Sequence, residues 1–302
     1  MGPEYREEPC KSALNRVAGG MHFQWSLNPY MGCVHRCTFC YVRGFEKRAD
    51  RPSGDGYGTS IRVKTNFVEV LRRELGRRSW RREHVAIGAA TDPYQPAGGG
   101  DRVTRGSIEA LGQARTPLSI ITRGPLIVRD VDVLQEASAR AQVGVSFSIP
   151  TLDADVWRTT EPGTAPPRQR LRALERLVQA GISAGVSIAP VIPGLTDGED
   201  QIEAVVKAAR DSGAVSLWCN VLHLKPGTKE HFLGHLRADW PELVEGVAGM
   251  YTGTYAPGEY QSSIKAAAEA LTVRYGIADR RSRPIEPVVM DRQLGFAGMD
   301  VR

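Results

Sequence analysis

Cys33-Val-His-Arg-Cys37-Thr-Phe-Cys40-Tyr41 places three cysteines within eight residues, just after an alternating segment that predicts a strand over residues 22–27. Thiolates are soft ligands that suit iron–sulfur clusters or zinc. Ordinary [4Fe–4S] electron carriers use four cysteine ligands, but neither Cys10 nor Cys219 has a spacing that makes it an obvious fourth. A cluster held by three cysteines leaves one iron open to a small molecule, as catalytic metal sites keep an open position.

The rest of the chain has the composition of a large folded domain. Its 302 residues are 41% apolar and 24% charged, which excludes a disordered chain and suits one large α/β domain or two small ones. The cysteine count is odd and no apolar signal segment is present, so we do not expect a secreted disulfide scaffold. No stretch approaches the roughly 20 apolar residues that span a bilayer. We therefore expect a soluble, cytoplasmic protein with no membrane partner.

Short apolar runs alternate with amphipathic segments along the chain. The predicted strands cover residues 22–27, 84–90, 118–122, 143–149, 184–192 and 214–224, and the predicted helices 67–75, 103–114, 130–140, 168–180 and 197–212, the last capped by Asp197. This alternation implies a parallel sheet with right-handed crossovers. Six strands favour an open, partial (βα)6 barrel over residues 1–224, with a helical C-terminal cap over 225–302. A doubly wound sheet is the competitor, and either fold places the chemistry at the carboxyl ends of the strands.

The spacing Cys-x3-Cys-x2-Cys, with Phe39 before the last cysteine, resembles the signature of the radical S-adenosylmethionine (SAM) superfamily. The resemblance implies a [4Fe–4S] cluster on Cys33, Cys37 and Cys40, with SAM chelated to the open iron and Phe39 near its adenine. One electron, from a reductant of the flavodoxin or ferredoxin type, would cleave SAM to a 5′-deoxyadenosyl radical. That radical abstracts hydrogen from a substrate.

Thr91-Asp-Pro-Tyr-Gln-Pro96 departs from the Gly-Gly-Glu that many superfamily members carry after the second strand. It resembles instead the subgroup related to spore photoproduct lyase, also described as DNA-repair-photolyase-like. Asn28-Pro-Tyr-x-Gly-Cys33 and Pro193-Gly-Leu-Thr-Asp197 agree with that subgroup. The resemblance implies that Thr91 and Asp92 hold the SAM amine. The alternative is that both residues only end the strand and cap a turn.

Further cofactor-binding residues follow from the same resemblance. Arg123 ends the third strand and would pair with the SAM carboxylate; a surface arginine is the alternative. Ser146 and Ser148 alternate on one face of the fourth strand and would reach the ribose hydroxyls, unless they are core serines bonded to backbone. Val191 and Ile192 would pack on adenine, and a core position is equally consistent with the sequence.

The lyase uses a cysteine after the second strand as hydrogen donor, and this chain has Ala89-Ala-Thr-Asp92 there. The lyase also has paired tyrosines around its last cluster cysteine, of which only Tyr41 remains. Thymine-dimer repair by the lyase chemistry is therefore not expected. Cys219 is a candidate substitute donor and Tyr41 a second candidate catalytic residue. A buried structural cysteine is the alternative for Cys219.

The sequence does not identify the substrate. The net charge of +5 and the arginine-rich segment 71–83 modestly favour a nucleic acid over a peptide or small molecule, although a solvated helix face gives the same pattern. Four C-terminal aromatic residues either pack as a cap or stack on bases: Trp240, Tyr251, Tyr255 and Tyr260. The alternative function is a zinc-stabilised, non-catalytic nucleic-acid-binding protein, with His35 or His22 as the fourth zinc ligand.

Overall fold

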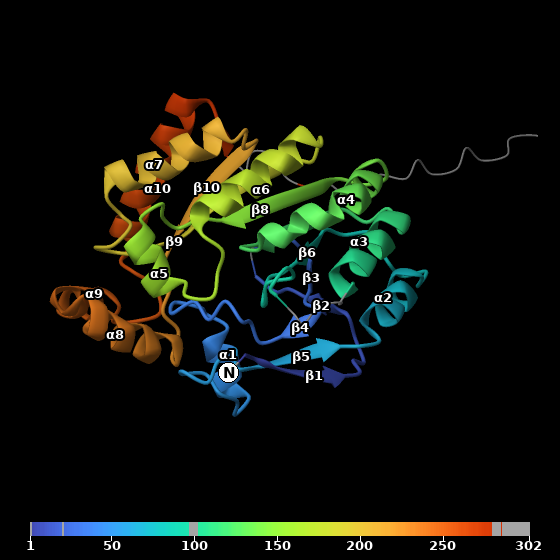
Figure 1. Ribbon diagram of the computed structural model, residues 1–302, viewed down its shortest axis with the longest axis horizontal. Coiled ribbons are helices and arrows are strands. Elements are labelled where there is room, and N and C mark those ends of the chain that lie inside the picture. The colour runs from blue at the N-terminus through green and yellow to red at the C-terminus, as the bar shows by residue number, and fades with distance from the viewer. Residues whose placement is uncertain (1, 20, 97–101, 280–284, 286–302) are drawn as a thin grey trace, which may run out of the picture.

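An eight-stranded sheet forms the body of the computed structural model, which describes residues 2–19, 21–96, 102–279 and 285 (Figure 1). Neighbouring strands are parallel throughout, except that the edge strand β2 runs antiparallel to β3. The strands, in spatial order, are β2 (Leu14–Arg16), β3 (Trp25–Leu27), β6 (Val85–Ile87), β7 (Leu118–Thr122), β8 (Val143–Ser148), β9 (Ala184–Val191), β10 (Ser216–Val221) and β11 (Ala278–Asp279). The six predicted strands correspond to β3 and β6–β10, and the partial α/β barrel is confirmed.

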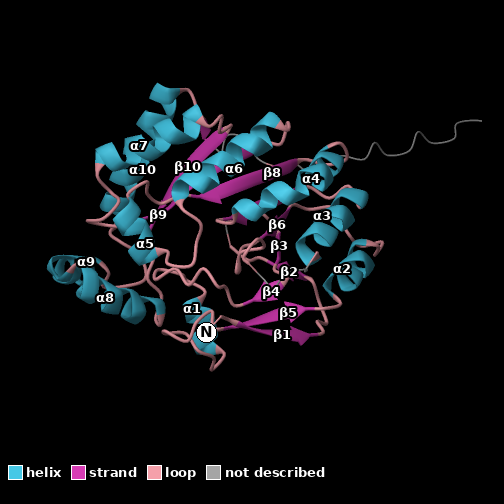
Figure 2. Ribbon diagram, in the orientation of Figure 1, coloured by secondary structure: helices cyan, strands magenta, loops and turns pink. Residues whose placement is uncertain are grey.

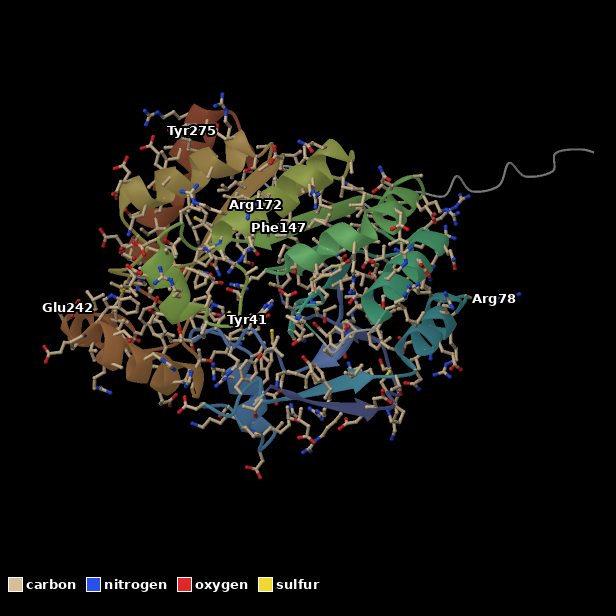
Figure 3. All side chains as sticks on the ribbon, in the orientation of Figure 1. Tyr41, Arg78, Phe147, Arg172, Glu242 and Tyr275 are labelled. Atoms are coloured by element: carbon tan, nitrogen blue, oxygen red, sulfur yellow. The ribbon has the colours of Figure 1, made fainter. Side chains whose placement is uncertain are left out.

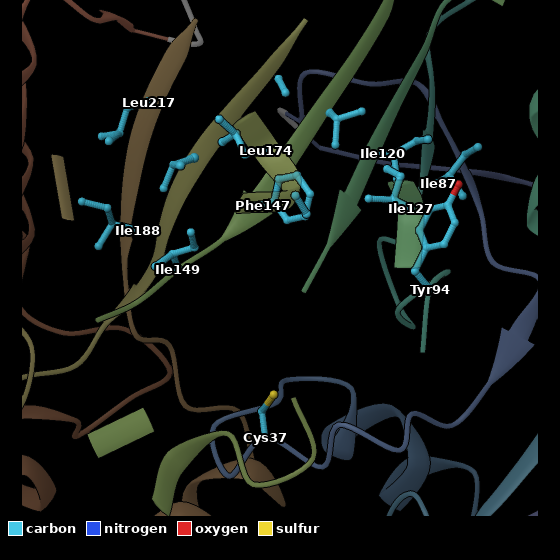
Figure 4. Close-up of a cluster of buried hydrophobic side chains, with 14 of the residues drawn as sticks. Cys37, Ile87, Tyr94, Ile120, Ile127, Phe147, Ile149, Leu174, Ile188 and Leu217 are labelled. Carbon is cyan, nitrogen blue, oxygen red and sulfur yellow. The ribbon is translucent and has the colours of Figure 1, made fainter. Parts of the chain in front are cut away.

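Helices cover one face of this sheet (Figure 2). They are α2 (Phe67–Leu75), α3 (Val103–Gln113), α4 (Val131–Ser138), α6 (Pro167–Gln179), α7 (Glu199–Asp211) and α10 (Gly258–Tyr275). The apolar stripe of α6 is buried, and Leu174 packs with Phe147 of β8 in the core between helices and sheet (Figure 4). The N-cap of α7 is not Asp197, the residue that the sequence predicted. Gly198 is the N-cap, while Asp197 accepts hydrogen bonds from the Gly194 amide and the Tyr260 hydroxyl.

Strand register separates the two faces of the sheet. Paired residues of parallel strands point the same way, and successive residues point opposite ways. Ser146 pairs with Ile121, and Trp218 pairs with Ser187, whose hydroxyl lies 2.5 Å from that of Ser146. These four residues therefore share the inner face, which opens to a pocket lined by Ile121. Phe147, one residue along from Ser146, points to the helices.

A second, three-stranded sheet was not predicted. It consists of β1 (Glu4–Glu8), β5 (Ser60–Lys64) and β4 (Tyr30–Met31), and it lies below the main sheet in the view of Figure 1. Its strands are too short, or too polar, to show a clear apolar period. Gly32 follows β4 with φ +87°, and a Cβ there would lie 2.8 Å from the Ser60 carbonyl oxygen. This sheet thus sets the point at which the cysteine loop begins.

The C-terminal segment is helical, as expected, with its break between α9 (Val244–Met250) and α10. Helix α8 (Thr228–Asp239) and the 3-10 turn Pro241–Leu243 precede α9, whereas α10 packs against α7 and β10. Short helices α1 (Arg43–Arg48) and α5 (Ala154–Thr160) and the 3-10 turn Pro125–Asp130 complete the elements. Of the expected cap over 225–302, residues 280–284 and 286–302 lie outside the described residues. None of the described helices is long and apolar enough to cross a membrane.

Candidate functional site

The three clustered cysteines line a pocket at the carboxyl ends of the strands. Cys33 and Cys37 are buried and Cys40 is partly buried. The same pocket is lined by Tyr41, by Thr91 and Asp92 after β6, and by Arg123 after β7, so segments far apart in sequence meet there. Figure 3 shows Tyr41 near the centre of the molecule, between the main sheet and the N-terminal segment.

A buried arginine that the sequence did not single out holds the cysteine loop. Arg43 donates from Nε to the Cys37 carbonyl (3.2 Å) and from Nη1 to the carbonyls of Ser53 (2.9 Å) and Gly54 (2.7 Å). Its guanidinium carbon lies 4.7 Å from the centre of the Tyr57 ring, whose hydroxyl is 3.7 Å from the Cys40 sulfur. Arg43 therefore ties the cysteine loop to segment 49–59, and its charge lies close to the thiols.

Gly58 in that segment leaves no room for a side chain. It has φ +77°, and a Cβ would fall 2.3 Å from the Cys33 carbonyl oxygen. Gly58→Ala is therefore expected to displace the loop, destabilise the fold by about 1–3 kcal/mol and lower iron incorporation severalfold. Iron per chain and the thermal midpoint measure this. Gly54→Ala is the matched control because a Cβ there meets nothing within 4 Å, and an equal loss of iron in both variants would contradict the account.

Thr91 and Gln95 clamp the start of the cysteine loop. The Thr91 hydroxyl donates to the Gly32 carbonyl (2.7 Å) and accepts from Gln95 Nε2 (3.0 Å). The Val34 amide in turn donates to Gln95 Oε1 (2.8 Å). The sequence Thr91–Pro96 thus acts on the loop through side-chain hydrogen bonds, and the role of Gln95 in it was not predicted.

Asp92 is buried, and both of its carboxylate oxygens have protein partners. Oδ1 accepts from the Thr122 hydroxyl (2.7 Å) and the Tyr94 amide (2.8 Å), and Oδ2 accepts from the Arg123 amide (2.6 Å). His35 Nδ1 lies 3.4 Å from Oδ2. Burial alone would raise the pKa of Asp92, but His35 and these donors lower it to about 2. Asp92 is thus a charged anchor that joins the ends of β6 and β7 to the cysteine loop.

His35 lies between Asp92 and the first cysteine. Its burial lowers its pKa, but the charges of Cys33 and Asp92 outweigh burial and raise the pKa to about 10. A protonated imidazole next to Cys33 adds to the positive charge that Arg43 and Arg123 bring to the cysteine loop. Positive groups near the thiols favour their ionised, metal-binding form.

A buried ion-pair network borders the pocket beyond β7. Arg123 donates from Nε to Glu161 Oε1 (2.5 Å) and from Nη2 to the Ala189 carbonyl (3.0 Å), and its guanidinium carbon lies 5.7 Å from the centre of the Phe39 ring. Glu161 also accepts from Arg170 Nη1 (3.1 Å), and neither Glu161 nor Arg170 has exposed surface. Within the described part of the chain, Arg123 Nη1 has no protein partner.

The donor set fits an iron–sulfur cluster better than one zinc ion. Sulfurs bound to a single zinc at about 2.3 Å lie about 3.8 Å apart. Among the described residues, the three cysteines do not form a group of ligand atoms within 4.8 Å of one another, with or without His35. His22 precedes β3, at the other end of the strands from the pocket. Burial raises the pKa of the Cys37 and Cys40 thiols, so a bound cation is needed to stabilise their thiolates.

Comparison with known proteins decides the family. The radical SAM superfamily model matches residues 27–214. The chain belongs to the radical SAM superfamily. An uncharacterized protein of Mycobacterium tuberculosis (strain ATCC 25618 / H37Rv) is 37% identical over 289 residues, 94% of this chain and 85% of that protein. A radical SAM Nα-GlyT isomerase of Pseudomonas phage M6 is 26% identical over 176 residues, 57% of this chain and 34% of the isomerase.

The fold is similar to that of spore photoproduct lyase. The structure of that lyase complexed with a dinucleoside spore photoproduct matches with a TM-score of 0.67 and 15% sequence identity, over 90% of this chain and 79% of the lyase chain. The radical SAM family uses a [4Fe–4S] cluster and SAM, which confirms the predicted cofactors and makes this chain an enzyme of radical chemistry. Such enzymes need an electron donor and a substrate.

The residues expected to contact SAM differ in their burial and in their hydrogen-bond partners. Phe39 is buried beneath the Arg123 guanidinium, beside the cysteines. Ser146 and Ser148 lie on the inner face, as their alternation predicts, with the Ser146 hydroxyl bonded to that of Ser187. Val191 and Ile192 have no exposed surface and belong to the main core. Val191 and Ile192 therefore occupy core positions, the alternative given above, and neither side chain has exposed surface that could contact adenine.

The structure does not bring Cys219 to the pocket. Cys219 pairs with Ile188 on β9, next to the pair of Trp218 with Ser187 on the inner face. Successive residues alternate, so Cys219 points to the helices, and the strand irregularity between Cys219 and Val221 comes only after it. This orientation is at odds with the expectation that Cys219 donates hydrogen to a substrate radical. Periodicity within one strand does not give the pairing between strands, so the sequence alone could not show it.

Of two other features singled out in the sequence, Tyr41 lies at the pocket and the arginines of segment 71–83 do not. Tyr41, the second candidate catalytic residue, lines the pocket and donates to the Ala89 carbonyl. The arginines of segment 71–83 lie at the end of α2 and in the connection that enters the start of β6, the end of the strands opposite the cysteines. Figure 3 shows Arg78 at the edge of the molecule, away from Tyr41. These arginines do not border the pocket.

Proposed function

We propose that this enzyme abstracts hydrogen from a nucleic acid, with a base of the substrate stacked at the mouth of the cysteine pocket. A row of rings that starts beside the last cysteine carries the proposal. The Tyr41 and His223 ring centres are 5.5 Å apart, and those of His223 and Tyr255 are 6.0 Å apart, with interplanar angles of 36° and 35°. Tyr255 is 63% exposed.

The other three C-terminal aromatic residues are packed or hydrogen-bonded within the protein, unlike Tyr255. Tyr251 is buried and donates to the Leu222 carbonyl (2.7 Å), Tyr260 donates to Asp197 (2.7 Å), and Trp240 packs against the core. Of the four, Tyr255 alone presents a large exposed ring. Exposed rings of this kind stack on bases because every base has a π-face.

Positive charge lies along the same row. The Lys225 ammonium is 5.4 Å and the Arg48 guanidinium carbon 5.0 Å from the centre of the Phe45 ring, which packs edge-on against Tyr41 at 5.7 Å. Cations beside a stacking surface bind the backbone phosphates of a single strand. The arginines of segment 71–83 take no part in this interface. In spore photoproduct lyase a related fold holds a dinucleoside photoproduct.

The bound cofactors would supply the 5′-deoxyadenosyl radical, and the chain would position the reactants. Cys33, Cys37 and Cys40 would hold the cluster. Arg123 lines the pocket and would bind the SAM carboxylate, while Asp92 fixes the Arg123 backbone. Tyr41 lines the same pocket and would help to exclude water from it. We further propose a flavodoxin or ferredoxin as the one-electron donor.

Tyr255→Ala tests the stacking surface. Loss of one stacked base costs about 1–3 kcal/mol, so the Kd for a single-stranded DNA oligonucleotide should rise about 5- to 150-fold. Cleavage of SAM without substrate should not change. Tyr275→Ala is the control, since Tyr275 lies on α10, away from the pocket (Figure 3). Equal Kd values for wild type and Tyr255→Ala would contradict the proposed surface.

Salt dependence distinguishes a nucleic acid from other substrate classes. Binding of single-stranded DNA or RNA through phosphates should weaken steeply as salt rises, with a linear fall of log K against log salt concentration. Fluorescence anisotropy with the cluster-loaded enzyme measures it. Absence of binding, together with 5′-deoxyadenosine formation stimulated by a peptide or small-molecule pool, would favour those substrates instead.

A further inference from the structure

A second group of metal-ligating side chains lies behind the cysteine loop. His231 and His235 are one turn apart on α8, which places them on the same face of the helix. Asp55, in segment 49–59, faces them. One ligand atom from each of these three residues lies within 4.8 Å of the other two. His231 Nδ1 is 3.8 Å from Asp55 Oδ1, and the imidazole centres are 4.6 Å apart.

We infer that Asp55, His231 and His235 form a second metal site, separate from the cysteine pocket, that takes a zinc-class divalent ion. Two imidazoles and a carboxylate are a common ligand set for zinc, with a water in the fourth position. Ligands about 2.0–2.2 Å from zinc lie about 3.4 Å apart in a tetrahedron. The present spacings need only small side-chain rotations to reach that geometry.

The exposure of the three side chains suits a bound ion. The His231 side chain is 9% exposed and that of Asp55 is 93% exposed, so the site is closed on the helix side and open to ions and water on the other. Imidazole nitrogens are the commonest protein ligands for a metal ion, and the two histidines offer them from one face of α8 toward the Asp55 carboxylate.

Such an ion would connect the C-terminal helices to the wall of the cysteine pocket. The Asp55 carbonyl accepts from Arg36 Nη2 (2.8 Å), and the same segment carries Tyr57 and Gly58, which contact the cysteine loop. Helix α8 already touches that loop, because the Thr228 hydroxyl donates to the Cys40 carbonyl (3.1 Å). The ion would therefore stabilise the packing of α8 on segment 49–59 without entering the radical chemistry.

Metal analysis of the cluster-loaded, full-length chain tests the inference. After equilibrium dialysis against micromolar zinc, wild type should hold one zinc per chain in addition to the cluster iron. His231→Ala, His235→Ala and Asp55→Asn should each weaken zinc binding by at least about 10-fold, with iron content unchanged. Zinc should also raise the thermal midpoint of wild type and not that of His231→Ala.

Two matched controls separate the site from nonspecific binding. His22→Ala removes an exposed histidine at the other end of the barrel, and Asp50→Asn removes an exposed carboxylate from the same segment as Asp55. Both should bind zinc like wild type. Absence of zinc in wild type, or zinc retained at full affinity by any of the three site variants, would overturn the inference. Because the readouts are zinc and iron content, either result leaves the proposed nucleic-acid substrate untouched.

Discussion

Cys37→Ala is expected to abolish reductive cleavage of SAM, and Cys33→Ala and Cys40→Ala to do the same. The three cysteines come from one loop, and no fourth cysteine lines the pocket among the described residues. Loss of one thiolate leaves two ligands for the cluster. Each variant should therefore lose the brown colour, the iron and the acid-labile sulfide of the anaerobically reconstituted enzyme, and form 5′-deoxyadenosine only at the level of a protein-free control.

Cys10→Ala is the control for these variants. The Cys10 backbone bonds to Asn66, and this cysteine lies outside the pocket. Its replacement should leave iron content and SAM cleavage at wild-type levels. Full activity of any one of the Cys33, Cys37 or Cys40 variants, or loss of the cluster in Cys10→Ala, would contradict the assignment of ligands.

Arg170→Leu is expected to destabilise the fold by about 3–5 kcal/mol, because it leaves the Glu161 carboxylate buried with one fewer positive partner. Arg170 has no exposed surface and also donates to the Ser148 carbonyl (2.8 Å) and to the Thr164 hydroxyl (2.5 Å). The thermal midpoint of the apo chain should fall by roughly 6–20 °C. Arg123 should keep its bond to Glu161, so some SAM binding should remain at low temperature.

Arg172→Leu is the matched control for this buried ion pair. Arg172 is exposed on the same helix (Figure 3), so its replacement should change the free energy of unfolding by no more than about 0.5 kcal/mol. Equal thermal midpoints for Arg170→Leu and wild type would show that the Glu161–Arg170 pair is not needed for the fold.

Apolar periodicity predicted the barrel because its strands and helices are long and have one buried face. Helix α2 begins and ends at the predicted residues, and β7 does as well. The cysteine loop could be singled out because Cys33, Cys37 and Cys40 lie within eight residues and their spacing resembles the family signature; that these three hold the cluster stays a prediction. The small sheet was not, since β4 has two residues and β1 is mostly exposed and charged.

Other features of the site depend on register and on long-range partners. The face to which Cys219 points follows from its pairing with Ile188, which one strand read alone does not give. Nothing in the sequence around Arg43 indicates its role. Its side chain is buried and donates to carbonyls of the cysteine loop and of segment 49–59. That Asp92 and Thr91 hold the SAM amine stays a prediction; the structure adds that their polar atoms also bond to Gly32 and Thr122, partners that the sequence does not show.

The central claim is that the chain generates a 5′-deoxyadenosyl radical from SAM at a cluster held by Cys33, Cys37 and Cys40. The most direct measurement is chromatographic quantification of products after anaerobic incubation of the reconstituted enzyme with dithionite and SAM. We expect equal amounts of 5′-deoxyadenosine and methionine, formed by wild type and not by Cys37→Ala. Failure of wild type with a fully loaded cluster to cleave SAM would contradict it.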